Sequence, residues 1–321
     1  MLRRKDDDVD DARSMLALAN PESGARCTAL ESARTVATSP QPFEHSPSPA
    51  HDVRSGHPRS PHEVAGQLAD AVKRMFSSPG AVRHELRFQP IVPVDRSGVT
   101  AFEVLSRFEI DGLGSVPPAE VFHEAERWGL DGDLTLEVLR SALRDCVAHV
   151  LPGVAVNVSH TLLADSGFVA SMLRELCRSG LPASSLTIEL VEGMREVAVA
   201  ELGKGVGMLR QAGVDASIDD FGTGARDFQH LCHLAVNEVK LDRSIIVDVS
   251  TSSRAQEVVR HLVALGTNHG IRILAEGVED RATAELVRHL GCGLLQGFWV
   301  ARPLTALDAV QFCRSRRRPD A

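Results

Sequence analysis

Residues Ala216–Phe221 read Ala-Ser-Ile-Asp-Asp-Phe, a short β-rich run that ends beside two adjacent acids. Neighbouring residues of a strand point to opposite faces of its sheet. Asp219 and Asp220 can therefore serve one site only if the backbone turns there, and we expect Phe221-Gly222-Thr223-Gly224 to supply that turn. The run predicts a strand that ends at a polar site.

Outward from this run, short β-rich segments alternate with longer helical patterns. The expected strands are Leu86–Val92, Ala101–Phe108, Val154–Ser159, Leu186–Glu192, Ala216–Phe221, Glu238–Asp242, Ile271–Val278 and Leu294–Val300. Helical signals lie between them from the second strand onward, among others over residues 118–129, 134–149, 196–212, 252–268 and 280–290. This alternation predicts an α/β fold, a TIM-type (β/α)8 barrel.

The first two expected strands depart from a regular barrel. Only Pro93–Thr100 separates them, which is too short for a crossover helix. They are therefore expected to pair as an antiparallel hairpin, which makes the predicted barrel a modified one with an antiparallel first strand.

The chain before the barrel divides into two segments. Residues 1–60 include a stretch rich in Pro, Ser and His from Ser39 to Pro61, which buries too little apolar surface to offset its ordering entropy. We expect a disordered tail or linker there, then a leading helix over residues 61–82 and the barrel domain over residues 83–321. An apolar side chain recurs every four residues through the leading helix, at Val64, Leu68, Val72 and Phe76.

Composition excludes some classes of function. Hydrophobic residues make up 43% of the chain and charged residues 24%, as in ordinary globular proteins. The formal net charge of -8 argues against DNA or RNA binding through the phosphate backbone. An anionic substrate would therefore require local cations, either metal ions or a few placed Lys and Arg side chains.

The cysteines and the beginning of the sequence indicate a cytoplasmic protein. None of the six cysteines forms a Cys-x-x-Cys pair, and their spacing matches no zinc or disulfide framework. Asp6-Asp7-Asp8 stands where a signal peptide needs an apolar stretch. Because no window reaches 18 uninterrupted apolar residues, we expect no membrane span and no membrane partner.

Polar side chains gather at the C-terminal ends of the expected strands, where the active face of such a barrel lies. They are Glu103, Asn157, Glu189, Glu192, Asp219, Asp220, Lys240, Asp242, Glu276, Glu279 and Gln296. Two carboxylates about 4 Å apart repel by about 4 kcal/mol at an intermediate dielectric. We therefore expect divalent cations to bind among them and offset this repulsion. Oxygen ligands suit Mg²⁺ or Mn²⁺. The pattern predicts a two-metal hydrolytic site, with Lys240 as a cation near the nucleophile or a phosphate.

The ordered motifs resemble the EAL-domain phosphodiesterases of bacterial second-messenger signalling over about three quarters of the chain. The motifs are Gln89-Pro90-Ile91, Glu103-Val104-Leu105 with Arg107, Pro118-x-Glu120-x-Phe122-x-x-Ala125-Glu126-x-x-Gly129-Leu130, Val156-Asn157-Val158-Ser159, Glu189-x-x-Glu192, Asp219-Asp220-Phe221-Gly222-Thr223-Gly224, Lys240-Leu241-Asp242-Arg243-Ser244, Ala275-Glu276-Gly277-Val278-Glu279, and Gln296-Gly297-Phe298 with Pro303. Each motif alone has little specificity, but the set in this order is highly specific.

The resemblance implies a hydrolase that converts cyclic di-GMP to linear pGpG with two Mg²⁺ or Mn²⁺ ions, and it implies a homodimer. It implies that Glu103, Asn157, Glu189 and Asp219 hold the first metal. Asp219 and Asp220 would serve the second metal, with Glu276 close to it. Lys240 would assist the attacking water, and Gln296 would help to order that water or the second metal. Gln89, Leu105 and Arg107 would contact the substrate, and Glu279 would brace the loop after Asp220.

Three departures from the family pattern distinguish this chain. Val104 replaces the Ala of the namesake motif, and Val191 replaces the usual Thr between Glu189 and Glu192. Gly224-Ala225-Arg226-Asp227-Phe228 stands where the family usually has Gly-Tyr-Ser-Ser-Leu. The altered loop leaves a second hypothesis open, a catalytically silent receptor for cyclic di-GMP or a protein-interaction module.

Other polar residues have structural interpretations. Glu192, Asp242 and Glu120 suit salt bridges or helix caps at least as well as direct roles in a site. His230-x-Cys232-His233 favours helix packing over a metal site. The basic end of the chain, Arg316-Arg317-Arg318, is expected to be a solvated tail.

Overall fold

The structure is a computed structural model that describes residues 61–76, 82–95, 97–191, 196–223 and 227–316. The tail expected at residues 1–60 lies outside the described residues, as do Glu192 and residues 224–226 of the altered loop.

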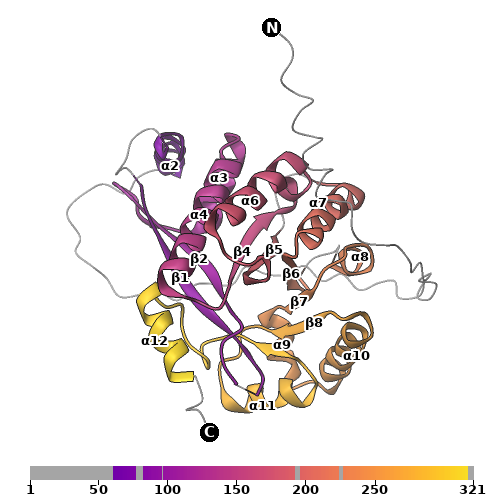
Figure 1. Ribbon diagram of the computed structural model, residues 1–321. Helices are drawn as coiled ribbons and strands as arrows, with labels where there is room; N and C mark the ends of the chain where they lie inside the picture. The colour runs from indigo at the N-terminus through magenta and orange to yellow at the C-terminus, as the bar shows by residue number, and fades with distance from the viewer. Residues whose placement is uncertain (1–60, 77–81, 96, 192–195, 224–226, 317–321) are drawn as a thin grey trace. The chain divides into compact units, whose positions relative to one another are not determined.

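The strands form one sheet that closes into an eight-stranded barrel, so the predicted modified TIM barrel is confirmed (Figure 1). The strands are β1 (Val82–Pro93), β2 (Ala101–Ile110), β3 (Gly114–Val116), β4 (Val154–Ser159), β5 (Leu186–Val191), β6 (Asp215–Phe221), β7 (Glu238–Leu241), β8 (Arg272–Ala275) and β9 (Leu294–Leu295). Their order is β1-β9-β8-β7-β6-β5-β4-β2-β3, and a β1–β2 pairing closes the ring.

The first strand is antiparallel to both of its neighbours, as its short connection to β2 predicts. It pairs with β2 from Val82 opposite Ile110 to Ile91 opposite Ala101, and it pairs with β9 at Val92 and Pro93. From β2 through β4 to β9 the neighbouring strands run parallel. The short β3 was not expected; it pairs with the far end of β2.

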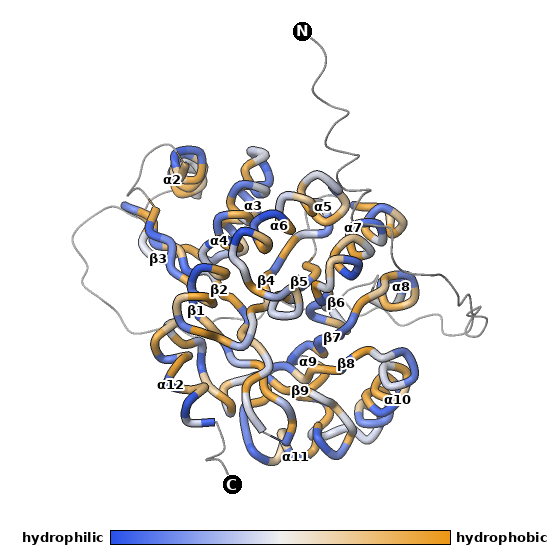
Figure 2. Tube along the Cα trace, viewed as in Figure 1, coloured by the Kyte–Doolittle hydropathy of each residue, from blue (hydrophilic) through white to orange (hydrophobic). Residues whose placement is uncertain are grey.

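Helices follow most of the parallel strands. They are α2 (Pro61–Arg74), α3 (Pro118–Arg127), α4 (Asp131–His149), α5 (His160–Leu163), α6 (Ser166–Ser179), α7 (Val199–Gln211), α8 (Asp227–His233), α9 (Arg243–Val249), α10 (Ser253–His269), α11 (Arg281–His289) and α12 (Ala306–Arg316). Several begin at side-chain caps: Asp165, Ser252 and Asp280 each accept a backbone N–H of the following first turn. Apolar residues concentrate on the barrel strands and on one side of the helices (Figure 2).

Two of the expected strands end earlier than the sequence pattern indicates. β8 ends at Ala275 and β9 at Leu295, whereas the apolar runs continue to Val278 and Val300. The backbone leaves the sheet at Gly277 and Gly297, which both have positive φ, so Glu276 and Gln296 stand at the strand ends.

The barrel interior below the site is filled by a small apolar layer. Ile91, Ala155, Leu274 and Leu294 form a cluster of their own, contributed by strands on different sides of the barrel. Most of the remaining core lies between the strands and the helices that cover them. At the N-terminal ends of the strands, Arg272 pairs with the buried Glu238 and with Asp215 and so joins β6, β7 and β8.

The helix that leads into the barrel is shorter than predicted. α2 ends at Arg74, and β1 begins at Val82, inside the range expected for the helix. Leu68 and Val72 are buried, but Val64 and Phe76 are exposed, because the packed face follows a three-and-four spacing through Leu68, Ala71 and Val72 rather than a strict repeat of four. This face packs on an apolar cluster from β2, β3, α3 and α4.

Among the helices that the structure describes, none combines the length and the apolar character that a bilayer crossing requires.

The glycines of α7 provide a matched test of the packing around the barrel. A Cβ at Gly205 would collide with the backbone carbonyl of Leu163 in α5, whereas a Cβ at Gly207 would meet no atom within 4 Å. We expect Gly205→Ala to lower the free energy of unfolding by about 2 kcal/mol through overpacking. Gly207→Ala should raise it by about 0.5 kcal/mol through helix propensity. Urea unfolding of both variants checks this, and equal effects would contradict the packing of α7 on α5.

Candidate active site

The strands bring the predicted polar residues together at the C-terminal end of the barrel. Each comes from a different strand or from the residue that follows it, except for the adjacent pair on β6. The contributing residues are Glu103 on β2, Asn157 on β4, Glu189 on β5, Asp219 and Asp220 on β6, Lys240 on β7, Glu276 after β8 and Gln296 after β9.

A single ammonium group stands at the centre of this cluster. Lys240 is 1% exposed, and its Nζ lies 2.7 Å from Oδ1 of Asp219 and 2.8 Å from Oε1 of Glu276. Nζ is also 3.0 Å from Oε1 of Glu189 and 3.5 Å from Oε2 of Glu103. Lys240, on β7, therefore contacts carboxylates that come from β2, β5, β6 and the residue after β8, and so ties these four strands together at the site.

Two amide side chains hold Glu103 from both sides. Gln296 donates from Nε2 to Oε2 of Glu103 at 2.6 Å, and Asn157 donates from Nδ2 to Oε1 at 3.4 Å. With their nitrogens used in this way, Asn157 Oδ1 and Gln296 Oε1 remain buried without a hydrogen-bond partner among the described residues. Both oxygens are hence available as ligands to a cation.

The adjacent acids of β6 reach one site through a turn at Asp220 itself. Asp220 has a φ of 48°, and the β6–β7 register shifts between Ile218 and Phe221. The predicted turn thus exists: it begins at Asp220, continues through Gly222, which has a φ of 111°, and is closed by the N–H of Thr223, which donates to the carbonyl of Asp220 at 3.2 Å. Asp tolerates this left-handed conformation better than most residues. Because of it, Asp219, Asp220 and Glu276 can offer oxygens that all lie within 4.8 Å of one another.

Burial dominates the electrostatics of the site. It raises the pKa of Glu189 well above its usual range, although Lys240 opposes the shift. Burial, partly offset by Lys240, raises the pKa of Glu276 to about 8, and burial together with Asp219 raises the pKa of Asp220 to about 6. Burial lowers the pKa of Lys240, but the surrounding carboxylates more than offset this and hold it well above its usual range. The raised pKa keeps Lys240 a cation, and two of the carboxyl groups that it contacts, those of Glu189 and Glu276, have a pKa above the usual range.

The donor set fits divalent cations of the Mg²⁺ or Mn²⁺ type. Every candidate ligand atom is a carboxylate or amide oxygen, and three of them are buried without a hydrogen-bond partner among the described residues: Asn157 Oδ1, Glu189 Oε2 and Gln296 Oε1. Glu189 Oε1 and Asp219 Oδ1 form ion pairs with the ammonium of Lys240, at 3.0 and 2.7 Å. A metal ion would use the lone pairs that these contacts leave unsatisfied.

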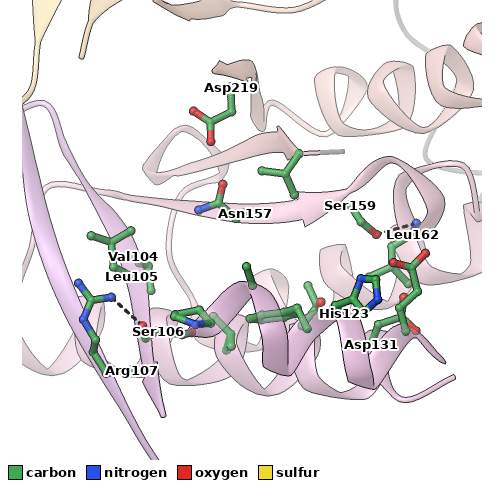
Figure 3. Close-up of a pocket in the computed structure, with 17 residues that line it drawn as sticks. Val104, Leu105, Ser106, Arg107, His123, Asp131, Asn157, Ser159, Leu162 and Asp219 are labelled. Atoms are coloured by element: carbon green, nitrogen blue, oxygen red, sulfur yellow. Dashed lines mark hydrogen bonds between the residues drawn. The ribbon is translucent and has the colours of Figure 1, made fainter. Parts of the chain in front are cut away.

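Two pockets open beside the cluster. One, of about 370 Å³, is lined by the acids of the cluster together with Gln89, Arg243 and Phe298. The other, of about 600 Å³, has a more apolar wall, and Figure 3 shows Asn157 and Asp219 on one side of it and His123 and Asp131 on the other. Leu105 and Asp219 line both pockets, so the two cavities adjoin at the carboxylate cluster.

The residues expected to contact a substrate all line these pockets. Gln89 lies opposite Glu103 in the β1–β2 pair, and Leu105 and Arg107 follow on the same face of β2. The exposed guanidinium of Arg107 donates from Nη1 to the carbonyl of Ser106 at 2.8 Å (Figure 3). Their roles stay predictions, since the structure gives position alone.

Glu279 has a partner that the sequence did not indicate. Its Oε1 pairs with Nη2 of Arg243 at 2.8 Å, and both side chains reach the smaller pocket. The loop that Glu279 is expected to brace includes residues outside the described part of the chain, so that expectation stays a prediction. Arg243 and Phe298 belong to two of the sequence motifs, but residue spacing along the chain does not indicate that their side chains face the acids.

The residues with structural interpretations lie away from the cluster's centre. Asp242 caps α9 by accepting the backbone N–H of Ser244 at 2.8 Å, and Glu120 is exposed in the first turn of α3. His230 is buried in α8 with its ring edge against His160, 4.8 Å between centroids.

A barrel with an antiparallel first strand and this acidic mouth defines the EAL class of domains. The family model described as "EAL domain" matches residues 71–303, and the chain belongs to this family.

Its relatives include named phosphodiesterases. The chain is 34% identical over 229 residues to the bifunctional diguanylate cyclase/cyclic di-GMP phosphodiesterase MucR of Pseudomonas aeruginosa, across 69% of this chain and 33% of MucR. It is 32% identical over 238 residues to the cyclic di-GMP phosphodiesterase NbdA of the same organism, across 73% of this chain and 30% of NbdA. The matches thus span about a third of the length of these curated relatives.

Solved structures show the same fold. The PaMucR phosphodiesterase in complex with c-di-GMP superimposes with a TM-score of 0.66 at 31% identity, over 77% of this chain and 99% of that chain. The EAL enzyme Bd1971, bound to cAMP and cyclic di-GMP, gives a TM-score of 0.69 at 22% identity over 79% of this chain and 70% of that chain, which supports the fold alone.

The raised pKa of Glu276 predicts a pH dependence of stability in protein treated with EDTA. The pKa of Glu276 is about 8 in the folded protein, so the side chain keeps its proton up to that pH, whereas in the unfolded chain it loses the proton near its ordinary pKa of 4.5. The folded state therefore binds more protons between these limits, and the free energy of unfolding should fall as pH rises through them. Urea unfolding at several pH values measures this.

Substitution isolates the contribution of Glu276. Glu276→Gln cannot titrate and should flatten the fall, whereas the exposed Glu109→Gln on β2 should leave it unchanged. Equal slopes in the parent protein and Glu276→Gln would show that this carboxyl does not have a raised pKa.

Proposed function

We propose that this chain hydrolyses cyclic di-GMP to linear pGpG at the carboxylate cluster, with two Mg²⁺ or Mn²⁺ ions. The observation that carries the proposal is the convergence of five carboxylates and one buried ammonium at the C-terminal mouth of an EAL barrel. Relatives named as cyclic di-GMP phosphodiesterases support the choice of substrate.

The ligand sets are those that the family resemblance implies, and the buried oxygens without partners and the Asp219–Asp220–Glu276 cluster support them. Glu103, Asn157, Glu189 and Asp219 would hold one ion, and Asp219, Asp220 and Glu276 the other. Two divalent ions bring four positive charges, which together with Lys240 would balance five carboxylates. When bound, such ions lower the pKa of water and stabilise negative charge on an attacked phosphate.

The chain's own cation and amides prepare the reaction. Lys240 is permanently charged and fixed by four ion pairs, so its ammonium can orient an attacking water and stabilise charge that develops on the phosphate. Gln296 holds Glu103 in place through its 2.6 Å hydrogen bond and thereby orders the ligand oxygens. These two residues act by position, before any substrate arrives.

Substrate contacts are assigned along the β1–β2 pair. Gln89 and Leu105 lie beside Glu103 at the pocket wall, and Arg107 presents an exposed guanidinium that suits a phosphate oxygen. Glu279, paired with Arg243, would support the loop after Asp220. The homodimer and the cytoplasmic location stay predictions.

Hydrolysis assays with a matched pair of variants test the proposal. Purified protein with Mg²⁺ or Mn²⁺ should convert cyclic di-GMP to linear pGpG, followed by chromatography. Glu103→Gln should lower the rate at least about a hundredfold, because it removes a charged metal ligand. Glu109→Gln lies on the same strand but points to solvent and pairs with Arg83, so it should retain the parent rate.

The same experiment separates the enzyme from a receptor. If no pGpG forms while cyclic di-GMP still binds, the catalytic proposal fails and the silent receptor is the better description. That outcome would direct attention to Gly224-Ala225-Arg226-Asp227-Phe228, where the sequence departs from its family.

A further inference from the structure

The turn after β9 fixes the backbone on both sides of one aromatic residue. Val278 donates its N–H to the carbonyl of Gln296 at 3.0 Å and accepts the N–H of Trp299 at 3.0 Å. Gly297 has a φ of 153°, and a Cβ there would collide with the backbone of Val278. Phe298 therefore projects from a backbone that cannot shift without breaking these contacts.

The side chain of Phe298 is half exposed although its chain neighbours are packed. Its exposed fraction is 49%, whereas Val300 is buried and Trp299 packs against the core. The guanidinium of Arg302 lies 4.2 Å from the ring centroid. This cation–π contact restrains the orientation of the ring and covers part of one of its faces, because a cation prefers the face of an aromatic ring.

The ring of Phe298 forms part of the wall of the smaller pocket, which charged side chains also line. Phe298 lines the smaller pocket together with Asp219, Asp220 and Glu276. An aromatic wall beside oxygen ligands for metals suits a ligand that joins a planar base to a phosphate, and base–aromatic stacking contributes about 1–3 kcal/mol per base.

The arrangement of the two pockets matches a ligand with two bases. They share Asp219 and Leu105; the carboxylate cluster lines the smaller pocket, and the larger pocket adjoins it. A phosphodiester centred at the cluster would direct one base into the larger, more apolar pocket and the other toward Phe298.

We propose that Phe298, positioned by Arg302, is the surface on which one base of the dinucleotide stacks, and that it sets affinity rather than the rate of the chemical step. This inference rests on the proposed function and adds a specificity residue to it. Since Phe298 contributes no polar group to the cluster, its loss should weaken substrate binding while the metal ligands stay in place.

Binding and kinetics of Phe298 variants test the inference. Phe298→Ala should raise the Kd and KM for cyclic di-GMP about tenfold, within the range expected for one lost stack, with kcat changed less than about twofold. Phe298→Trp should restore affinity, and its added fluorescence should be quenched on binding. Val258→Ala on α10 is a matched control, since Val258 is also 49% exposed but lines neither pocket.

A smaller substrate separates stacking from damage to the site. Methyl p-nitrophenyl phosphate carries no nucleobase, so Phe298→Ala should hydrolyse it at the parent rate. Parent-like binding of cyclic di-GMP by Phe298→Ala would overturn the inference and leave the proposed function intact. If the parent protein neither binds nor hydrolyses cyclic di-GMP, the proposed function fails and this inference with it.

Discussion

The site depends on one interaction, the burial of a single ammonium group among carboxylates that four different strands position. An isolated charge is costly to bury, and so are several like charges at one barrel mouth. Lys240 offsets both costs at once through contacts of 2.7 to 3.5 Å. Because these strands are linked through their register, the same contacts that balance charge also fix where the oxygens of Glu103 and Asp219 stand.

The barrel is built so that this polar end is tolerated. Below the cluster, a small apolar layer of Ile91, Ala155, Leu274 and Leu294 fills the barrel interior. Most of the hydrophobic core lies between the strands and the helices that cover them. The opposite end is closed by Arg272 with Glu238 and Asp215. The packing that stabilises the fold thus lies mainly between the strands and the helices. The C-terminal end of the barrel can therefore carry acids, although these acids lower the free energy of unfolding at high pH.

The barrel and the convergence of the polar side chains could be predicted from the sequence, because both depend on local features of the chain. The short Pro93–Thr100 connection determined the antiparallel strand, and acids at apolar strand ends indicated a common mouth. The sequence predicted a turn beside Asp219 and Asp220, but not that Asp220 itself would adopt a positive φ, because residue spacing does not show which residue of a turn takes that conformation. The Arg243–Glu279 pair and the position of Phe298 could not be predicted, because both depend on tertiary contacts. The helix α12 was not predicted because its apolar pattern is weak: Ala309 is its one fully buried residue.

The β1–β2 pair extends well beyond the rim of the barrel. Its register runs unbroken from Ile91 opposite Ala101 to Val82 opposite Ile110. One end carries Gln89 and Glu103 at the site, and the apolar face of β2 toward the other end packs in one cluster with α2. A paired ribbon of this kind twists but hardly stretches, so a displacement of α2 would reach Glu103 through the strand pair without the two strands separating.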